Sequence, residues 1–443
     1  MNEEDIKIIK IPYGDKEMQA YIPATSFLFN GEMTKFSPIE DFERILLDKL
    51  EHPIGCEALK SQVKKDDKIL ILIDDNTRVT PVNKILPVLI KYLTNDMGIP
   101  LENIEVLTAP GTHRVMTEDE IVEKVGEEIF KTVKISQHDF TDKNALIDMG
   151  TIEANGMKFP IHVNKKVQEV DYIIGLGNII PHSDAGYSGG GKIVQPGICG
   201  SATTSATHVA GALMERIPLG NIEDNPCRKG IEEVAKIVGL KFIINVVMTP
   251  DGEVTGVFAG DFIKAHREGA KLAAKVYGVK IPELADIVVV SSSPCDIDYW
   301  QAEKGLISAY FSVKKDGYII FVAPCYEGLV HNHPKLIEWA KASYEESKNI
   351  VGKIPLDEDE ADLVAADIAM GNARVRERAK ILIVTEGLDD KEISILGYKK
   401  IGTLQEAVNY ALKEIPGGKV GVLPRGGDCL PMIISATHMT SGK

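Results

Sequence analysis

The sequence predicts an α/β protein of two α/β domains, each with a mostly parallel sheet, and an active site in the cleft between them. Apolar runs of strand length alternate with segments whose apolar residues recur at helical spacing. This alternation is typical of parallel strands joined by helices. The chain has 443 residues, and one domain commonly holds about 100–200. We therefore expect an N-terminal domain over residues 1–275, to which a tail over 415–443 returns, and a C-terminal domain over 276–414.

In the first domain, three continuous apolar runs predict buried strands of a parallel sheet. They cover residues 68–73, 104–108 and 170–180. A helix is predicted after Pro81, where apolar residues recur at helical spacing. A second helix is predicted after Thr117, because Thr117 and Glu120 have the spacing of a capping box.

In the second domain, the same alternation begins near Pro282. The predicted strands cover residues 285–291, 317–322 and 379–385. We place the boundary near residue 275, because the preceding helix is predicted to end at Gly278. The apolar run at 419–423 predicts one more strand, which we expect to return to the first domain.

The composition excludes several classes of protein. A net charge of −15 argues against general nucleic-acid binding, which needs a basic surface to neutralise phosphates. No apolar run reaches the length of about 20 residues that spans a bilayer. The acidic start lacks the apolar core of a signal peptide, and the six cysteines contain no Cys-x-x-Cys pair. We therefore expect a cytoplasmic protein that acts on a small molecule and binds neither nucleic acid nor a membrane.

Polar side chains follow the predicted strands of the first domain at the points where those strands end. Asp75 and Arg78 follow the first strand, His113 follows the second, and His182 follows the third. Ligands of open parallel sheets bind beyond the carboxyl ends of the strands, so these loops can bring the four side chains together. Each residue also has a structural interpretation: Asp75 could cap the next helix and pair with Arg78, and a loop histidine is often a surface residue. Because such polar side chains follow three different strands, we favour a shared site.

A glycine-rich run ending in Lys192 is the fourth motif. The spacing from Gly186 to Gly191 and Lys192 matches most of a phosphate-binding P-loop. The match fails at Ile193, where that loop needs Ser or Thr, and at Pro196, where its helix should continue. A nucleotide triphosphatase is therefore a minor alternative. The Gly175-x-Gly177 pair is likewise incomplete as a dinucleotide fingerprint, because Ile180 occupies the third glycine position.

The glycines before Lys192 allow close backbone approach and leave the lysine amine little crowded. Such a lysine can serve as a point charge for an anion, or as a nucleophile when its amine is desolvated. His208 follows in a predicted helix, where it is either a structural residue or an imidazole ligand of a soft metal.

In the second domain, Trp300, Gln301 and Lys304 follow the first predicted strand. Gln301 and Lys304 are three residues apart, so a helix places them on one face, where an amide and an ammonium could hold an anionic substrate. The alternative is a solvated helix end with Trp300 in a domain interface.

Together these motifs resemble the nickel-dependent lactate racemase family. The resemblance covers nearly the whole chain in motif order. It rests on Asp75, Arg78, Gly111, His113, Arg114, Pro181, His182, the run 188–192, Pro196, Gly197, His208, Gln301 and Lys304. It implies a racemase or epimerase of a small 2-hydroxy acid, together with separate proteins that mature the cofactor.

The resemblance also implies a nickel-pincer nucleotide, a pyridinium-3-thioamide-5-thiocarboxylic acid mononucleotide that carries nickel. Lys192 matches the lysine that forms the thioamide, and His208 matches the histidine ligand of nickel. The remaining residues implied around the cofactor are Thr77, Gly189, Gly190 and Gly191.

The resemblance assigns the catalytic and substrate residues as well. His113 and His182 match an acid–base pair on opposite faces of the substrate, and Asp75 matches a residue that orients its neighbours. The residues implied around the substrate are Arg78, Gln301, Lys304 and Trp300. The lactate enzymes carry tyrosine at the position of Trp300, so the resemblance does not fix the substrate.

The chemistry explains these residue types. The C2–H bond of a 2-hydroxy acid is weakly acidic, so oxidation to a planar 2-keto acid with return of hydride to the other face is the easier route. Imidazoles titrate near neutral pH and suit proton transfer at the hydroxyl group. Two other classes remain open at this point: a hydrolase whose zinc is held by His113, His182 and His208, and a non-enzymatic protein that binds small anions.

Overall fold

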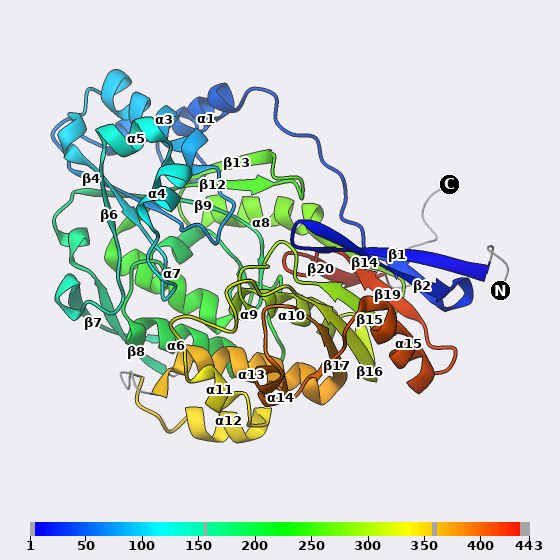
Figure 1. The fold of residues 1–443 in the computed structure, drawn as a ribbon. Coiled ribbons are helices and arrows are strands. Elements are labelled where there is room, and N and C mark those ends of the chain that lie inside the picture. The colour runs from blue at the N-terminus through cyan, green and yellow to red at the C-terminus, as the bar shows by residue number, and fades with distance from the viewer. Residues whose placement is uncertain (1–4, 155–156, 357–360, 435–443) are drawn as a thin grey trace. The chain divides into compact units, whose positions relative to one another are not determined.

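The computed structural model describes residues 5–154, 157–356 and 361–434. The chain divides into two compact units. The central unit comprises residues 35–276 and 355–363, and the terminal unit comprises residues 1–34, 277–354 and 364–443. Each unit contains a six-stranded sheet, and most strand pairs are parallel (Figure 1). The expected α/β architecture with mostly parallel sheets is therefore confirmed.

The sheet of the central unit has the strand order β13-β12-β9-β4-β5-β6. Its strands are β4 (Ile69–Ile73), β5 (Ile104–Thr108), β6 (Lys134–Gln137), β9 (Tyr172–Asn178), β12 (Leu240–Met248) and β13 (Val254–Gly260). Only β13 runs antiparallel to its neighbour among these described strands. Two hairpins accompany this sheet, formed by β7 (Leu146–Ala154) with β8 (Met157–Asn164) and by β10 (Pro181–His182) with β11 (Gly186–Tyr187).

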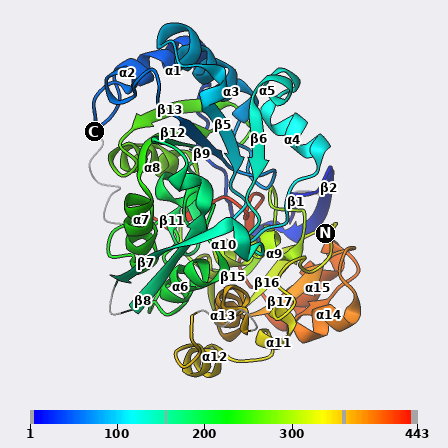
Figure 2. The same cartoon turned by 90° about the vertical axis from the view of Figure 1, so that its left-hand side faces the viewer.

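Helices cover both faces of this sheet, which explains why β4 is apolar at every position. Ile69, Ile71 and Ile73 pack in one core cluster, and Leu70 and Leu72 pack in another. The helices of the first face are α1 (Phe42–Glu51), α2 (Leu59–Gln62), α3 (Val82–Lys91), α4 (Glu118–Val125) and α5 (Glu127–Thr132). On the second face lie α7 (Pro226–Val238) and α8 (Lys264–Val276), and α6 (Ser201–Ala212) packs on α7 and β8 (Figure 2).

The sheet of the terminal unit has the order β18-β17-β16-β15-β19-β3, and all its pairs are parallel. Its strands are β3 (Phe27–Asn30), β15 (Ala285–Ser291), β16 (Val313–Val322), β17 (Ala379–Val384), β18 (Lys399–Lys400) and β19 (Val420–Leu423). The hairpin of β1 (Ile6–Tyr13) and β2 (Lys16–Pro23) packs with this sheet in one core cluster. A separate parallel pair joins β14 (Gly278–Ile281) to β20 (Leu430–Ile433).

The helices of the terminal unit surround this sheet. They are α9 (Tyr299–Ala302), α10 (Lys304–Tyr310), α11 (Leu336–Trp339), α12 (Tyr344–Val351), α13 (Leu363–Arg378), α14 (Asp390–Ile395) and α15 (Leu404–Glu414). Among the residues that the structure describes, no helix is both long and apolar enough to cross a membrane.

Two local expectations differ from the structure. The tail strand was expected to return to the first domain, but β19 pairs with β15 and β3 inside the terminal unit. An apolar run identifies a buried strand, whereas its partner depends on long-range packing that the run does not encode. The helix expected to end at Gly278 ends at Val276 instead, because Gly278 is the first residue of β14.

Candidate active site

The loops that follow β4 and β5 form one hydrogen-bonded cluster in the central unit. Asp75 lies just beyond the end of β4, and one of its carboxylate oxygens is 2.7 Å from Nδ1 of His113, which lies beyond the end of β5. The hydroxyl of Thr77 donates to the other oxygen of Asp75 at 2.6 Å, and Nη1 of Arg78 donates to that hydroxyl at 2.8 Å. The structure thus joins the predicted residues Asp75, Thr77, Arg78 and His113.

The charge of Asp75 fixes the tautomer of His113. Burial alone raises the pKa of Asp75, but the His113 ring and the Arg78 guanidinium outweigh it and hold that pKa well below its ordinary value. An ionised carboxylate only accepts hydrogen bonds, so Nδ1 of His113 carries the hydrogen. The lone pair of the neutral ring is therefore on Nε2, where it can accept a proton.

Buried and half-buried ion pairs hold these loops against the helix α4. Arg114 forms two hydrogen bonds with Glu120, at 2.8 and 2.7 Å, and these bonds lower the pKa of Glu120 to about 2. Lys124 pairs with Asp74 at 2.8 Å and donates to the carbonyl of Arg78 at 2.7 Å. Arg114 and Asp74 therefore support the loops rather than face a ligand.

The hairpin β10–β11 brings His182 to Lys192. Nε2 of His182 lies 3.2 Å from Nζ of Lys192, and Nδ1 accepts the backbone N–H of Asp184 at 3.1 Å. Both side chains are partly buried in the central unit. The structure thus brings together two predicted site residues, His182 and Lys192, whose contact with each other the sequence did not predict.

The glycine-rich run makes a tight turn that only glycine fits. Gly189 has a φ of 76°, and a Cβ there would lie 2.8 Å from Oδ1 of Asn245. That oxygen accepts the backbone N–H of Gly190 at 2.8 Å. Residues Gly190–Ile193 form a single 3-10 turn instead of the long helix that follows a P-loop, which argues against the nucleotide triphosphatase alternative.

Arg228, in α7, holds this turn by hydrogen bonds, a role that its sequence context does not indicate. Its side chain is fully buried and donates to the carbonyls of Ala185, Tyr187 and Gly189. Burial lowers the pKa of Arg228 to about 10, so it remains a cation at neutral pH. A charge in an amphipathic helix is normally a solvated residue, and only the tertiary structure shows that this one is a buried scaffold.

The charge of Lys192 depends on this environment. Its pKa is lowered to about 8, chiefly by burial and also by the cations of Arg228 and Arg78, against the opposing effects of Cys227 and Asp184. Arg78 therefore acts electrostatically on Lys192, although the two lie on different loops. The backbone N–H of Gly111 also donates to the carbonyl of Gly197 at 3.0 Å, which ties the His113 loop to the segment that follows the glycine-rich run.

His208 lies in α6, as its helical context predicted, and its ring is oriented by the helix itself. Nδ1 lies 2.9 Å from the carbonyl oxygen of Thr204 and donates to it. The lone pair of the neutral ring is then on Nε2, which is the state in which imidazole binds a metal, and a backbone carbonyl is a usual partner of the other nitrogen. A carboxylate oxygen of Asp184 lies within 4.8 Å of a His208 ring nitrogen. The sequence had assigned no role to Asp184.

In the terminal unit, Gln301 and Lys304 contact each other where α9 ends and α10 begins. The ammonium of Lys304 donates to the side-chain oxygen of Gln301, and Asp298 caps α9 by accepting the N–H of Gln301 at 2.8 Å. The ring of Trp300 stacks on His333 with centroids 4.3 Å apart. Gln301 and Lys304 therefore meet at the junction of two short helices and not on one face of a single helix.

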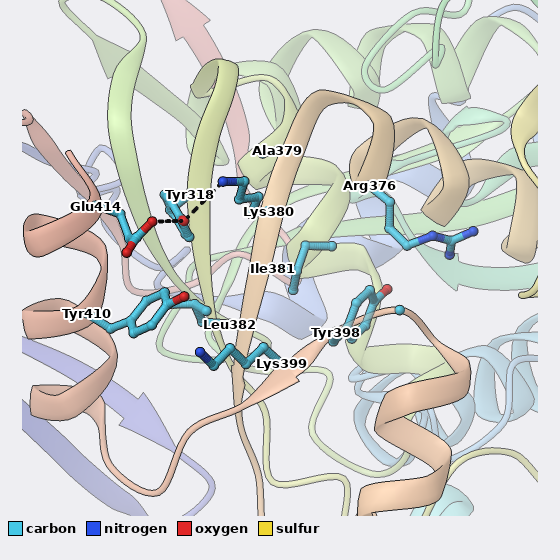
Figure 3. A pocket seen from close by; sticks show the side chains of 11 residues that line it. Tyr318, Arg376, Ala379, Lys380, Ile381, Leu382, Tyr398, Lys399, Tyr410 and Glu414 are labelled. Atoms are coloured by element: carbon cyan, nitrogen blue, oxygen red, sulfur yellow. Dashed lines mark hydrogen bonds between the residues drawn. The ribbon is translucent and has the colours of Figure 1, made fainter.

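A pocket of about 370 Å³ lies elsewhere in the terminal unit and contains no residue of these motifs (Figure 3). Its charged groups bind one another. The hydroxyl of Tyr318 accepts from Lys380 at 3.3 Å and donates to Glu414 at 3.5 Å, and Lys399 lies 3.8 Å from the ring centre of Tyr410. The charged groups of this pocket are thus engaged with one another and with aromatic side chains. We therefore do not place the active site there.

A buried histidine behind the glycine-rich run predicts acid sensitivity. His138 is fully buried between Cys199 and Asn164, and burial lowers its pKa to about 4. Its folded pKa is lower than its unfolded pKa of about 6.5. Above 6.5 both states are neutral, and below 6.5 only the unfolded state takes up the proton. The stability is therefore lost as the pH falls from 6.5 to 4, by roughly 3 kcal/mol in all.

This dependence can be measured by urea unfolding at neutral and mildly acidic pH. We expect His138→Gln to lose less stability than the wild type on acidification, and His52→Ala, at an exposed histidine, to behave like the wild type. An unchanged pH dependence in His138→Gln would contradict the assignment.

Comparisons with known proteins identify the family of this chain. The chain matches the lactate racemase N-terminal domain over residues 13–218 and the lactate racemase C-terminal domain over residues 281–429. A lactate racemase of Lactiplantibacillus plantarum is 30% identical over 432 residues, with 94% of this chain and 98% of the relative covered. A lactate racemase of Thermoanaerobacterium thermosaccharolyticum is 28% identical over 427 residues, with 94% and 97% covered.

Solved structures show the same relationship. The lactate racemase apoprotein from Thermoanaerobacterium thermosaccharolyticum superposes with a TM-score of 0.84 at 27% identity, with 96% of this chain and 100% of that chain covered. A Thermotoga maritima protein of 21% identity shares the fold, with a TM-score of 0.70 over 90% of this chain and 100% of that chain. Since both domain families match and a relative at 30% identity aligns along most of its length, the chain belongs to the lactate racemase family and is an isomerase of the racemase type.

Proposed function

We propose that this chain interconverts the enantiomers of a small 2-hydroxy acid, such as lactate, through a 2-keto acid. The observation that carries the proposal is the pair of oriented histidines. His113 is held by Asp75 with its lone pair on Nε2, and His182 is held with Nε2 facing Lys192. A racemase needs one proton-transferring group for each enantiomer, and two histidines on separate loops can supply both.

The residues around Lys192 fit a nickel-pincer nucleotide. Lys192 offers a desolvated amine for the thioamide, and Gly189, Gly190 and Gly191 form the tight turn that holds it, packed closely against neighbouring side chains. The fit also includes His208, whose Nδ1–H is engaged by the carbonyl of Thr204 as in metal-bound histidines. When bound, this group supplies a hydride acceptor for C2. We expect separate maturation proteins to provide it.

The other residues bind and orient the substrate. In one direction His113 takes the hydroxyl proton through the lone pair on Nε2 and His182 donates a proton through its Nε2–H, and the two roles reverse in the other direction. The guanidinium of Arg78 is anchored through Thr77 and can hold a carboxylate by its fork of donors. We retain Gln301, Lys304 and Trp300 as predicted substrate-binding residues, and we propose a cytoplasmic location from the spacing of the cysteines.

The alternative of a zinc hydrolase has less support. A zinc held by three histidines would need a ring nitrogen of His182, yet one nitrogen accepts the Asp184 N–H and the other faces the Lys192 amine. Nickel and sulfur analysis of protein made with the maturation proteins, together with a search for zinc, separates the two hypotheses.

The proposal is tested by turnover of single enantiomers in heavy water. We expect the loaded protein to convert a short 2-hydroxy acid to its mirror image with little solvent deuterium at C2. The physical reason is that the histidines exchange only the hydroxyl proton, so the C2 hydrogen returns to its own carbon. A substrate deuterated at C2 should keep its label and react more slowly.

Two results would contradict this proposal. Solvent deuterium at C2 in nearly every product molecule, measured at low conversion, would indicate removal of a proton from carbon. Absence of turnover across a panel of 2-hydroxy acids, with cofactor loading verified by intact mass, would remove the assigned activity.

A further inference from the structure

The hydrogen bonds around His182 assign its tautomer. The backbone N–H groups of Asp184 and Ala185 both point at Nδ1, at 3.1 and 3.5 Å. An oxygen of the Asp184 carboxylate also lies 3.5 Å from Nδ1, but it faces two N–H donors at that nitrogen, so Nδ1 presents its lone pair to them. The hydrogen of the neutral ring is therefore on Nε2, which is the opposite of the arrangement in His113.

This tautomer determines what Lys192 can be. The hydrogen on Nε2 of His182 faces Nζ of Lys192 across 3.2 Å. An ammonium has three donors and no acceptor, so a charged Lys192 would oppose one N–H with another. An uncharged amine has a lone pair that accepts the hydrogen bond. The contact therefore favours Lys192 as a neutral amine.

Burial and two neighbouring cations also favour the neutral amine of Lys192. Burial lowers the pKa of this lysine to about 8, and the cations of Arg228 and Arg78 contribute to the decrease. Cys227 and Asp184 oppose it. The guanidinium of Arg228 donates a hydrogen bond to the carbonyl of Gly189 at 3.3 Å. This bond holds the positive charge of Arg228 next to the turn.

We infer that His182 has a second role before any turnover: it is a positioning residue that holds Lys192 as an uncharged, nucleophilic amine for its own acylation. This inference rests on the proposed function, which assigns Lys192 as the attachment point. The electrophile is an aromatic thiocarboxylate or another activated acyl group. The role differs from proton transfer to a substrate, because it needs only an N–H donor at this position.

The step balances without an oxidant or a reductant. The nitrogen of Lys192 attacks the carbonyl carbon of a thiocarboxylate, a C–N bond forms, and the C–O bond breaks. The oxygen leaves as water with one proton from the amine and one from solvent, and the sulfur stays on carbon as the thioamide. With a simple activated ester, the alcohol part leaves instead and an ordinary amide forms.

The test is limited acetylation of the protein made without maturation proteins, with the N-hydroxysuccinimide ester of acetic acid as the probe. Peptide mass spectrometry compares the labelling rate of Lys192 with that of Lys236, which is exposed on α7. In the wild type, we expect Lys192 to reach its half-maximal rate near pH 8, with Lys236 as the solvent-exposed reference.

Two variants separate the N–H donor from the rest of the imidazole. His182→Gln keeps a side-chain N–H donor and should keep a profile close to that of the wild type. His182→Ala removes the donor and should move the Lys192 profile toward that of Lys236. His52→Ala, at an exposed histidine, is the control and should change neither profile. The inference is overturned if His182→Ala keeps the wild-type profile, or if His182→Gln shifts as far as His182→Ala.

A second measurement distinguishes this inference from the proposed function. When made with the maturation proteins, His182→Gln should gain the nucleotide adduct but should not racemise, because an amide cannot exchange a proton. If wild-type Lys192 is acetylated near pH 8 but the protein never gains an adduct, the cofactor assignment fails while the reactive amine stands. If the wild type gains the adduct but Lys192 follows the profile of Lys236, the reactive-amine inference fails alone.

Discussion

Lys192→Ala is expected to abolish both the covalent adduct and the racemase activity. The proposed thioamide needs a primary amine at the end of the glycine turn, and alanine supplies none. Protein produced with the maturation proteins should therefore lose one nucleotide-sized mass increment relative to the wild type. Lys236→Ala removes an exposed lysine from α7 and should keep both the increment and the turnover.

Lys192→Arg separates the two chemical roles that the sequence left open for this residue. Arginine keeps a positive charge but is not a nucleophile at neutral pH. If Lys192 were only a point charge for an anion, this variant would retain much of the activity. We expect it to be as inactive as Lys192→Ala and to lack the adduct. An unmodified mass in a fully active wild type would contradict the covalent assignment.

The fold was largely predictable because its signals are local. The apolar runs at 104–108 and 285–291 coincide with β5 and β15, and the capping box of Thr117 and Glu120 starts α4. The partners of the strands were less predictable. β19 is a buried apolar run like β4, yet its place next to β15 depends on packing with distant strands. A run of apolar residues fixes burial and leaves the neighbour open.

The site was predictable where residues follow strand ends, because those ends gather at one edge of a parallel sheet. Asp75 and His113 follow the adjacent strands β4 and β5 and meet as expected. The contact between His182 and Lys192 was not predictable, since it depends on the β10–β11 hairpin and the turn at Gly189. Arg228 was missed because its burial arises only when α7 packs under that turn.

His113→Ala is expected to lower the turnover of the loaded enzyme by about 10²–10⁴-fold, as is typical for the loss of one positioned acid or base. The cofactor should remain attached, because His113 is held by Asp75 on another loop, whereas the amine of Lys192 lies against His182. Initial rates for each enantiomer and the intact mass together measure these effects. A rate that stayed intact in both directions would show that His113 is not one of the two proton-transferring groups.

Asp75→Asn gives the finer test of the same step, because it changes the tautomer of His113 and leaves the imidazole in place. In the wild type, the carboxylate of Asp75 accepts the Nδ1 hydrogen of His113 at 2.7 Å and so keeps a lone pair on Nε2. An asparagine amide can donate to Nδ1, which then accepts and transfers the ring hydrogen to Nε2. The ring would have the wrong tautomer to take a hydroxyl proton. We therefore expect a large fall in kcat for at least one enantiomer with the adduct mass unchanged. Wild-type kcat in both directions would mean that the pairing of Asp75 with His113 supports the loop and does not orient the base.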